Sequence, residues 1–211
     1  MEFLVPYDRR DPKTRLEPVF DHTERAAFAA AMLEDVLLAF DSSRHDPRIL
    51  STAPIDGEKA VLERTPVTID ERPLTDAVNA EIEEAEEPIG VLMADLPLIR
   101  PETIDELAST SGDVVIGPGL GGGTNALVVR DRSFRVDYHG ASVLDHRSRA
   151  KTIGVTVSEF DSRRLATDID DPEDLIEVLL HGEGKTANWL TEAGFRLDID
   201  DAYRRVTFVR D

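Results

Sequence analysis

The stretch Gly90-Val91-Leu92-Met93-Ala94-Asp95-Leu96-Pro97 is an apolar run that ends in one acid and is broken by a proline two residues later. Short runs of this kind, rich in Val, Leu and Ile, are typical of strands buried in a parallel sheet. In an open α/β sheet, ligands bind beyond the carboxyl ends of the strands. The run therefore predicts a central strand and places Asp95 where a functional site is expected.

Outward from this run, strand-like and helix-like segments alternate. Asp21 and Glu24 form a capping-box pattern, and the apolar residues that follow at i+4 spacing predict a long amphipathic helix. Further helices are predicted over 75–87 and 101–109, and strands over 3–5 (closed by Pro6), 48–52, 67–69, 89–94, 114–117, 126–129 and 153–157. The alternation predicts an α/β fold, a three-layer α/β/α sandwich with a mostly parallel central sheet.

Length and charge narrow the function. The chain has 211 residues, which predicts one domain spanning 1–211. Asp and Glu number 43 against 24 Lys and Arg, a net charge of −19, and this excludes a general nucleic-acid binder, which needs a basic face. No apolar run approaches the length of a membrane span, and the first residues lack the pattern of a signal peptide, so we expect a cytoplasmic protein without a membrane partner.

The composition also constrains metals and source. There is no cysteine, so a metal must bind to carboxylates, carbonyls or His, which favours a hard cation. The basic residues are 20 Arg and only 4 Lys, and the acids are spread along the chain. This pattern is typical of proteins from a high-salt cytoplasm, where salt screens self-repulsion. The alternative is an ordinary acidic enzyme.

A second acidic element is Asp168-Ile169-Asp170-Asp171, followed by Pro172. In an extended segment, alternation sends Asp168 and Asp170 to the same side, where two carboxylates repel unless a cation or protons intervene. Asp171 is suited to cap a helix over 173–180. We therefore expect a functional role for Asp168 and Asp170 and a structural one for Asp171. Asp95 could hold Mg²⁺, the alternative being a cap of the turn that precedes the helix at Pro101.

The run 117–125 contains five glycines and ends in Thr124-Asn125, directly before a predicted strand. Glycines let backbone N–H groups approach an anion without obstruction by Cβ. The run fits neither the Rossmann nor the P-loop pattern. It predicts an anion-binding loop, with a flexible hairpin connection as the alternative.

Positive charge is concentrated after the first predicted strand. The segment 9–15 holds four bases and one acid, and it follows a strand that ends at the same sheet edge as Asp95. Such a cluster would attract a polyanionic ligand, although a solvated basic loop is the alternative. Further along, Tyr138-His139-Gly140-Ala141-Ser142 could present donors to a phosphate. A Ser/His hydrolase is not predicted there, because no Gly-x-Ser-x-Gly elbow is present and His139 and His146 are expected at the surface or in packing.

Several motifs, taken together, resemble one family. They are Val5-Pro6-Tyr7, Pro12-Lys13-Thr14-Arg15-Leu16, Met93-Ala94-Asp95-Leu96-Pro97-Leu98, Gly121-Gly122-Gly123-Thr124-Asn125-Ala126-Leu127 and Asp168-Ile169-Asp170. The chain resembles the archaeal 2-phospho-L-lactate guanylyltransferases of coenzyme F-420 biosynthesis from Phe3 to about Gly184. This resemblance implies the nucleotidyltransferase fold, which is nucleotide-diphospho-sugar-transferase-like and is shared with molybdenum-cofactor guanylyltransferases.

The resemblance also implies a reaction and a site. GTP and 2-phospho-L-lactate would give lactyl-2-diphospho-5′-guanosine and pyrophosphate, with Mg²⁺ as cofactor. The implied roles are metal binding by Asp95, Asp168 and Asp170, catalysis by Asp95 and Lys13, nucleotide binding by Pro6, Arg9, Lys13 and Arg15, and acceptor binding by Thr124, Asn125, Gly140 and Ser142. Asp8 departs from the family, in which a lysine often follows Val-Pro-Tyr, so a phosphate role there shifts to Arg9 or Lys13.

The acceptor phosphate has a second pKa near 6, so it attacks as a dianion and needs no general base. Catalysis then reduces to alignment and charge neutralisation. The alternatives are the same chemistry with phosphoenolpyruvate or another phospho-acid, a metal-dependent glycosyltransferase, and a non-catalytic nucleotide-binding regulator. A homodimer is possible.

Overall fold

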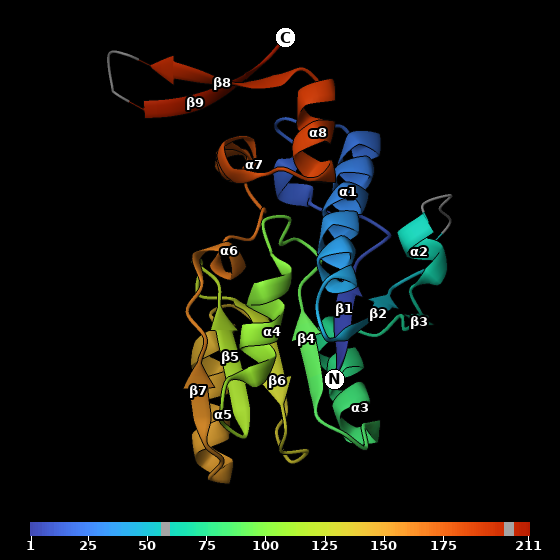
Figure 1. Ribbon diagram of the computed structural model, residues 1–211, viewed down its shortest axis with the longest axis vertical. Helices are drawn as coiled ribbons and strands as arrows, with labels where there is room; N and C mark the ends of the chain where they lie inside the picture. Colours follow the sequence, from blue (N-terminus) through green and yellow to red (C-terminus); the bar gives the residue numbers. More distant parts are fainter. Residues whose placement is uncertain (56–59, 201–204) are drawn as a thin grey trace.

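The computed structural model describes residues 1–55, 60–200 and 205–211. Its seven-stranded sheet has the order β3-β2-β1-β4-β6-β5-β7, and a separate two-stranded sheet pairs β8 with β9 (Figure 1). The strands are β1 (Glu2–Tyr7), β2 (Asp46–Ser51), β3 (Val67–Ile69), β4 (Ile89–Leu92), β5 (Val114–Pro118), β6 (Thr124–Val129), β7 (Val157–Glu159), β8 (Phe195–Asp200) and β9 (Arg205–Arg210). The helices are α1 (His22–Asp41), α2 (Ala60–Arg64), α3 (Leu74–Glu84), α4 (Pro101–Ser109), α5 (Ser142–Ile153), α6 (Arg163–Ala166), α7 (Leu175–His181) and α8 (Lys185–Glu192), with short 3-10 turns η1 (Thr14–Leu16) and η2 (Pro172–Asp174).

The large sheet is mostly parallel, as predicted. Strand β1 pairs in parallel with β2 and β4, β2 with β3, and β5 with β7. Strand β6 alone in this sheet runs antiparallel to its neighbours, β4 and β5. The carboxyl ends of β1, β4 and β5 therefore share one edge with the beginning of β6, where the glycine run lies.

Two apolar layers cover the faces of this sheet and confirm the three-layer architecture. On one face, α1, α4, α6, α7 and α8 pack against alternate strand residues such as Phe3 and Val5. On the other face, α3 and α5 pack against residues such as Leu4 and Val91. Figure 1 shows these layers, with β8 and β9 projecting beyond α8.

Helix α1 forms for the predicted reasons. Asp21 accepts a hydrogen bond from the Glu24 N–H at 2.9 Å, and the Glu24 carboxylate accepts one from the Asp21 N–H at 3.0 Å. The side chains at i+4 spacing, from Phe28 to Phe40, are buried against the sheet. This helix covers the face of the sheet below the loop that follows β1.

Several predicted bounds are wrong: the helix predicted over 75–87 ends at Glu84, the strand predicted over 89–94 ends at Leu92, and two further cases follow. Pro6 does not close the first strand, because β1 continues to Tyr7 beside β2. Strand β4 pairs only with Glu2–Leu4, so one side of β1 at Pro6 needs no ladder donor. The strand predicted over 153–157 is instead the end of α5, closed by Gly154 with a φ of 78°, followed by β7.

In the described part of the chain, no helix combines the length and apolar character needed to cross a membrane.

Candidate active site

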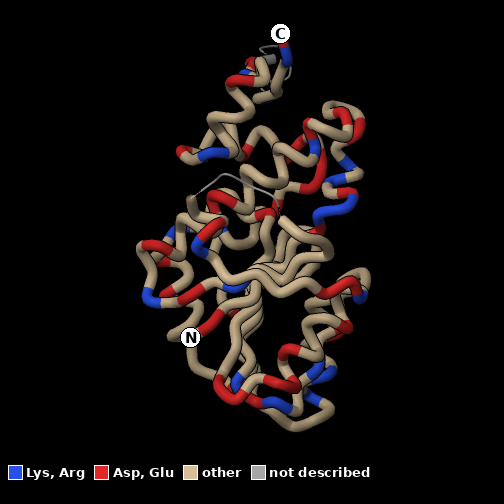
Figure 2. Tube along the Cα trace, turned by 90° about the vertical axis from the view of Figure 1, so that its right-hand side faces the viewer, with Lys and Arg blue, Asp and Glu red and all other residues tan. Residues whose placement is uncertain are grey.

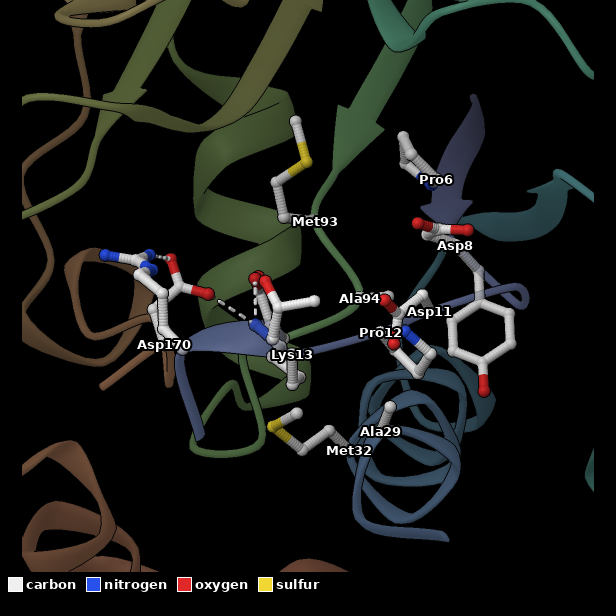
Figure 3. A pocket seen from close by; sticks show the side chains of 14 residues that line it. Pro6, Asp8, Asp11, Pro12, Lys13, Ala29, Met32, Met93, Ala94 and Asp170 are labelled. Atoms are coloured by element: carbon white, nitrogen blue, oxygen red, sulfur yellow. Dashed lines mark hydrogen bonds and ion pairs between the residues drawn. The ribbon is translucent and has the colours of Figure 1, made fainter. Parts of the chain in front are cut away.

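The loop after β1, the loop after β4 and the segment before η2 meet at Lys13. The Lys13 Nζ donates to Asp95 Oδ2 at 2.7 Å and to Asp170 Oδ1 at 2.6 Å. Figure 3 shows this ammonium joined to Asp170 among the side chains that line a pocket. A backbone bond from the Ile169 N–H to the Asp95 carbonyl, 3.1 Å, ties the two acidic segments together. The sequence prediction that the basic cluster and Asp95 share one sheet edge is thus confirmed.

The backbone and the charge of Lys13 are both unusual. Its φ is 55°, and it is the one residue other than glycine with a positive φ among those that the structure describes. A side chain pays a steric penalty in this region, which is sustained where the surroundings fix the conformation. The Lys13 side chain is only 10% exposed. Burial disfavours its charge, but Asp95 and Asp170 outweigh burial and raise the pKa of Lys13.

The carboxyl groups of Asp168 and Asp170, near Lys13, have pKa values shifted in opposite directions. Burial raises the pKa of Asp168, and the nearby charges of Asp95 and Asp170 raise it further. Burial also acts on Asp170, but Lys13 and Arg15 lower its pKa overall. Oδ1 of Asp95 is buried and has no hydrogen-bond partner in the part of the chain that the structure describes. Among the described residues, no three His, Asp or Glu side chains are gathered into a group that could hold a metal ion.

Two cavities open on either side of one ion pair. The first has a volume of about 320 Å³ and is lined by the loop after β1, by Met32 of α1 and by Asp95. The second has a volume of about 570 Å³ and lies between the glycine run and the segment around η2. Arg15 and Asp170 line both cavities and form an ion pair with each other. Arg15 also pairs with Asp171 at 2.9 Å.

The glycine run borders the second cavity with bare backbone. A Cβ built on Gly121 or Gly123 would meet nothing within 4 Å, and Gly122 has a φ of 83°. The Gly119 N–H donates to the Gly123 carbonyl at 2.8 Å and closes the loop. No described group accepts a hydrogen bond from the N–H of Gly121 or Gly123. The loop therefore presents two free backbone donors beside the cavity.

The predicted acceptor residues occupy two environments. Gly140 lines the second cavity with Gly121 and Gly123. The hydroxyls of Thr124 and Ser142 are buried and bond each other at 3.1 Å. Asn125 Nδ2 donates to Asp168 Oδ1 at 3.0 Å, which holds that carboxylate.

Three of the four predicted nucleotide residues line the first cavity, and Arg9 does not. Pro6, Lys13 and Arg15 line it. Arg9 lies in the same loop, and its backbone N–H donates to Thr52 Oγ1 at 3.1 Å. Its guanidinium makes no hydrogen bond or ion pair with any residue that the structure describes, and its Nε is buried.

Sequence reasoning missed Arg163, which lines the second cavity and pairs with Glu177 at 2.9 Å. Its position directly after β7, at the edge where parallel strands end, was the available signal. His146 was expected at the surface or in packing; it is buried, and it also bonds Thr124 Oγ1 at 2.9 Å.

Comparisons with known proteins agree on one class. The chain is 53% identical over 201 residues to a 2-phospho-L-lactate guanylyltransferase of Halomicrobium mukohataei, covering 95% of this chain and 96% of the relative. It is 52% identical to the protein of the same name from Natronomonas pharaonis, covering 93% and 94%. A crystal structure from Desulfovibrio desulfuricans, described as a nucleotide-diphospho-sugar transferase, superposes with a TM-score of 0.71 at 18% identity, covering 90% of this chain and 94% of that one.

The fold and the charged site at the carboxyl edge of the sheet define a nucleotidyltransferase. Residues 1–210 match the family described as "Guanylyl transferase CofC like", and the chain belongs to this family. This assignment supports the guanylyltransferase reading of the sequence over a glycosyltransferase or a non-catalytic regulator.

Proposed function

We propose that the protein joins GTP to 2-phospho-L-lactate, giving lactyl-2-diphospho-5′-guanosine and pyrophosphate, and that residues 1–211 act as one catalytic domain in the cytoplasm. The observation that carries this proposal is the pair of cavities separated by Arg15 and Asp170. A reaction that joins two phosphorylated molecules needs two adjoining anion sites with cationic groups where they meet. The curated relatives at about half identity carry the name of this reaction.

The first cavity suits the nucleotide. Lys13 and Arg15 present positive charge to it, and the guanidinium of Arg9, in the loop that lines it, has no partner in the described chain. A triphosphate would supply the oxygens that Arg9 lacks, because guanidinium groups bind phosphate oxygens in pairs. Arg9 and Lys13 thus take over the phosphate role that Asp8 cannot perform.

The second cavity suits the acceptor. The free N–H groups of Gly121 and Gly123 are donors for a phosphate or carboxylate, and Arg163 adds a cation at the same cavity. An oxygen of the acceptor phosphate forms the bond to the α-phosphorus of GTP. The bond from that phosphorus to the bridging oxygen breaks, and pyrophosphate leaves with the electron pair.

Asp95, Asp168 and Asp170 offer the oxygen ligands that a hard cation prefers, and the buried Asp95 Oδ1 has no hydrogen-bond partner among the described residues. The three carboxylates are not gathered around a metal position in the described structure, so Mg²⁺ would bind there only after Lys13 leaves the space between Asp95 and Asp170. When bound, the cation would neutralise developing charge on the phosphates. Asn125 orients Asp168 for this role, and Lys13 holds the carboxylates of Asp95 and Asp170 close together.

Pyrophosphate release with GTP and phospholactate tests the reaction, with phosphoenolpyruvate as a competing acceptor. We expect Asp95→Asn to keep the circular dichroism of the wild type and to lose most turnover, as excess EDTA should in the wild type. Lys13→Ala should raise the KM for GTP and leave the KM for phospholactate nearly unchanged. A defect confined to phospholactate would mean that the two sites are exchanged, and full turnover of Asp95→Asn would refute the metal assignment.

A further inference from the structure

His146 lies on α5, behind the glycine run, and is fully buried. The rings of Phe134 and Tyr138 meet it edge-on, with centroids 5.8 and 5.3 Å away. Because burial lowers the pKa of His146 to about 4, its imidazole is neutral at neutral pH. No step of the proposed reaction uses this side chain directly.

The hydrogen bonds of His146 fix its tautomer. The Asp137 backbone N–H, which can only donate, lies 2.9 Å from Nε2. Nε2 must therefore accept, and the ring proton resides on Nδ1. Nδ1 then donates to Thr124 Oγ1 at 2.9 Å. One neutral ring thus connects two segments of the chain that both lead into the second cavity.

These two segments carry the bare backbone of that cavity. Thr124 directly follows the free N–H of Gly123, and Asp137 lies three residues before Gly140. Helix α5 is joined to the same loop by two more bonds, from Ser142 Oγ to Thr124 Oγ1 at 3.1 Å and from the Val143 N–H to the Gly122 carbonyl at 3.3 Å. Glycines have no side chains to fix their own conformation, so their N–H groups are held by such neighbouring anchors.

We propose that His146 is a positioning residue, which acts through Thr124 to aim the N–H groups of Gly121 and Gly123 at the anionic acceptor. The proposal rests on the acceptor site described under the proposed function. It assigns to His146 no contact with substrate and no proton transfer. Its role is selective, because neither the glycine run nor the segment 137–140 lines the first cavity.

Two near-isosteric variants separate the two hydrogen bonds of the ring. In His146→Asn, the amide N–H occupies the place of Nδ1 and can still reach Thr124. In His146→Gln, the amide oxygen occupies the place of Nε2, so the bond to Asp137 can persist while the bond to Thr124 is lost. His22→Gln is the matched control, because His22 is exposed at the start of α1.

We expect His146→Gln to raise the KM for phospholactate about ten-fold, the effect of one buried hydrogen bond, with the KM for GTP unchanged. His146→Asn should recover most of this loss, and His22→Gln should match the wild type. Thr124→Val removes the same bond from the other end. It should show the same selective loss, and the double variant with His146→Gln should be no worse than the worse single variant.

Amide hydrogen exchange over residues 119–124 supplies a readout that does not depend on turnover. We expect faster exchange in His146→Gln than in His146→Asn and the wild type. Equal exchange in all three, or an unchanged KM for phospholactate in a folded His146→Gln, would overturn the proposal. An equal rise of both KM values would also overturn it. A wild type that releases no pyrophosphate would refute the proposed function instead, and the exchange comparison would still decide the role of His146.

Discussion

The most consequential single residue is Lys13, whose ammonium already occupies the space between two carboxylates of the proposed metal site. Its bonds to Asp95 and Asp170 are 2.7 and 2.6 Å long. A Mg²⁺ ion would approach the same oxygens to about 2.1 Å. Two cations would repel each other strongly at these oxygens, so a bound metal would have to compete with the ammonium of Lys13.

This arrangement predicts a weak response of the free protein to metal. We expect Mg²⁺ or Mn²⁺ alone to change the wild-type melting temperature little at constant ionic strength. Lys13→Met should start less stable and gain several degrees on addition of metal, because the vacated carboxylates bind it. Thermal melts with and without metal check this, with Lys151→Met, an exposed position, as the control. An equal metal response of Lys13→Met and the wild type would contradict the prediction.

His146 predicts a pH dependence of stability. Its pKa is lowered from 6.5 to about 4 in the folded protein, so below pH 6.5 the unfolded chain binds a proton that the folded chain does not. As the pH is lowered from about 6.5 to about 4, the free energy of unfolding should therefore fall by about 1.4 kcal/mol for each pH unit. Denaturant titrations at about pH 7 and pH 5.5 check this. His146→Asn should lose less stability over the same interval, and a slope equal to that of the wild type would contradict the assignment.

At the scale of elements, helix α8 is docked by a cap supplied from α1. Asp35 accepts hydrogen bonds from the N–H groups of Lys185 at 2.6 Å and Thr186 at 2.8 Å. Gly184 permits this approach, because a Cβ there would lie 2.2 Å from Asp35 Oδ1. The backbone of Gly184 is ordinary, with a φ of −100°, so the requirement is steric.

Gly184→Ala should therefore displace the Asp35 carboxylate and cost about 1 to 2 kcal/mol, the loss of a helix cap with some overpacking. Asp35→Ala should cost a similar amount, and the double variant should be less than additive because both changes remove the same contact. Denaturant unfolding of the three variants checks this. Gly121→Ala, which meets open space, is the control, and full additivity would contradict the shared mechanism.

The sequence predicts those elements whose pattern is local. Helix α4 was predicted over its observed bounds, 101–109, and α1 by its capping box. The reversal of β6, the short helix α6 and the hairpin of β8 and β9 were not predicted, because strand direction and short elements depend on distant partners. At the site, the rule that parallel strands end at one edge of the sheet predicted that Lys13 and Asp95 lie close together. The sequence could not predict the tautomer of His146, because its two hydrogen-bond partners, Thr124 and Asp137, lie in other segments of the chain.

For the whole molecule, charge is the dominant property. Acidic residues lie along the entire chain, with basic residues interspersed among them (Figure 2). Many arginines are paired locally, as Arg48 is with Glu2 and Glu81. The net charge is still −19, and the folded chain must stay compact against this self-repulsion.

We therefore expect the protein to lose stability at low salt. The screening length grows from about 3 Å at 1 M salt to about 30 Å at 0.01 M, which exposes each acid to many others. Melting temperatures at molar and at ten-millimolar KCl check this, with sucrose at low salt as a control for general stabilisation by cosolvent. Equal melting temperatures in the two salt conditions would refute the expectation of a high-salt cytoplasm.

One feature of the fold bears on how the chain is made. Trp189 of α8 closes an aromatic cluster, with ring centroids 5.2 Å from Phe20 and 5.4 Å from Phe28. Synthesis at about 5 to 20 residues per second separates Phe28 from Trp189 by roughly 8 to 30 seconds. Lys13 can pair with Asp95 early, whereas Asp170 is added almost as late as Trp189. A nascent chain thus carries aromatic rings that Trp189 does not yet cover until its last quarter leaves the ribosome, and during this interval its acidic repulsion opposes aggregation.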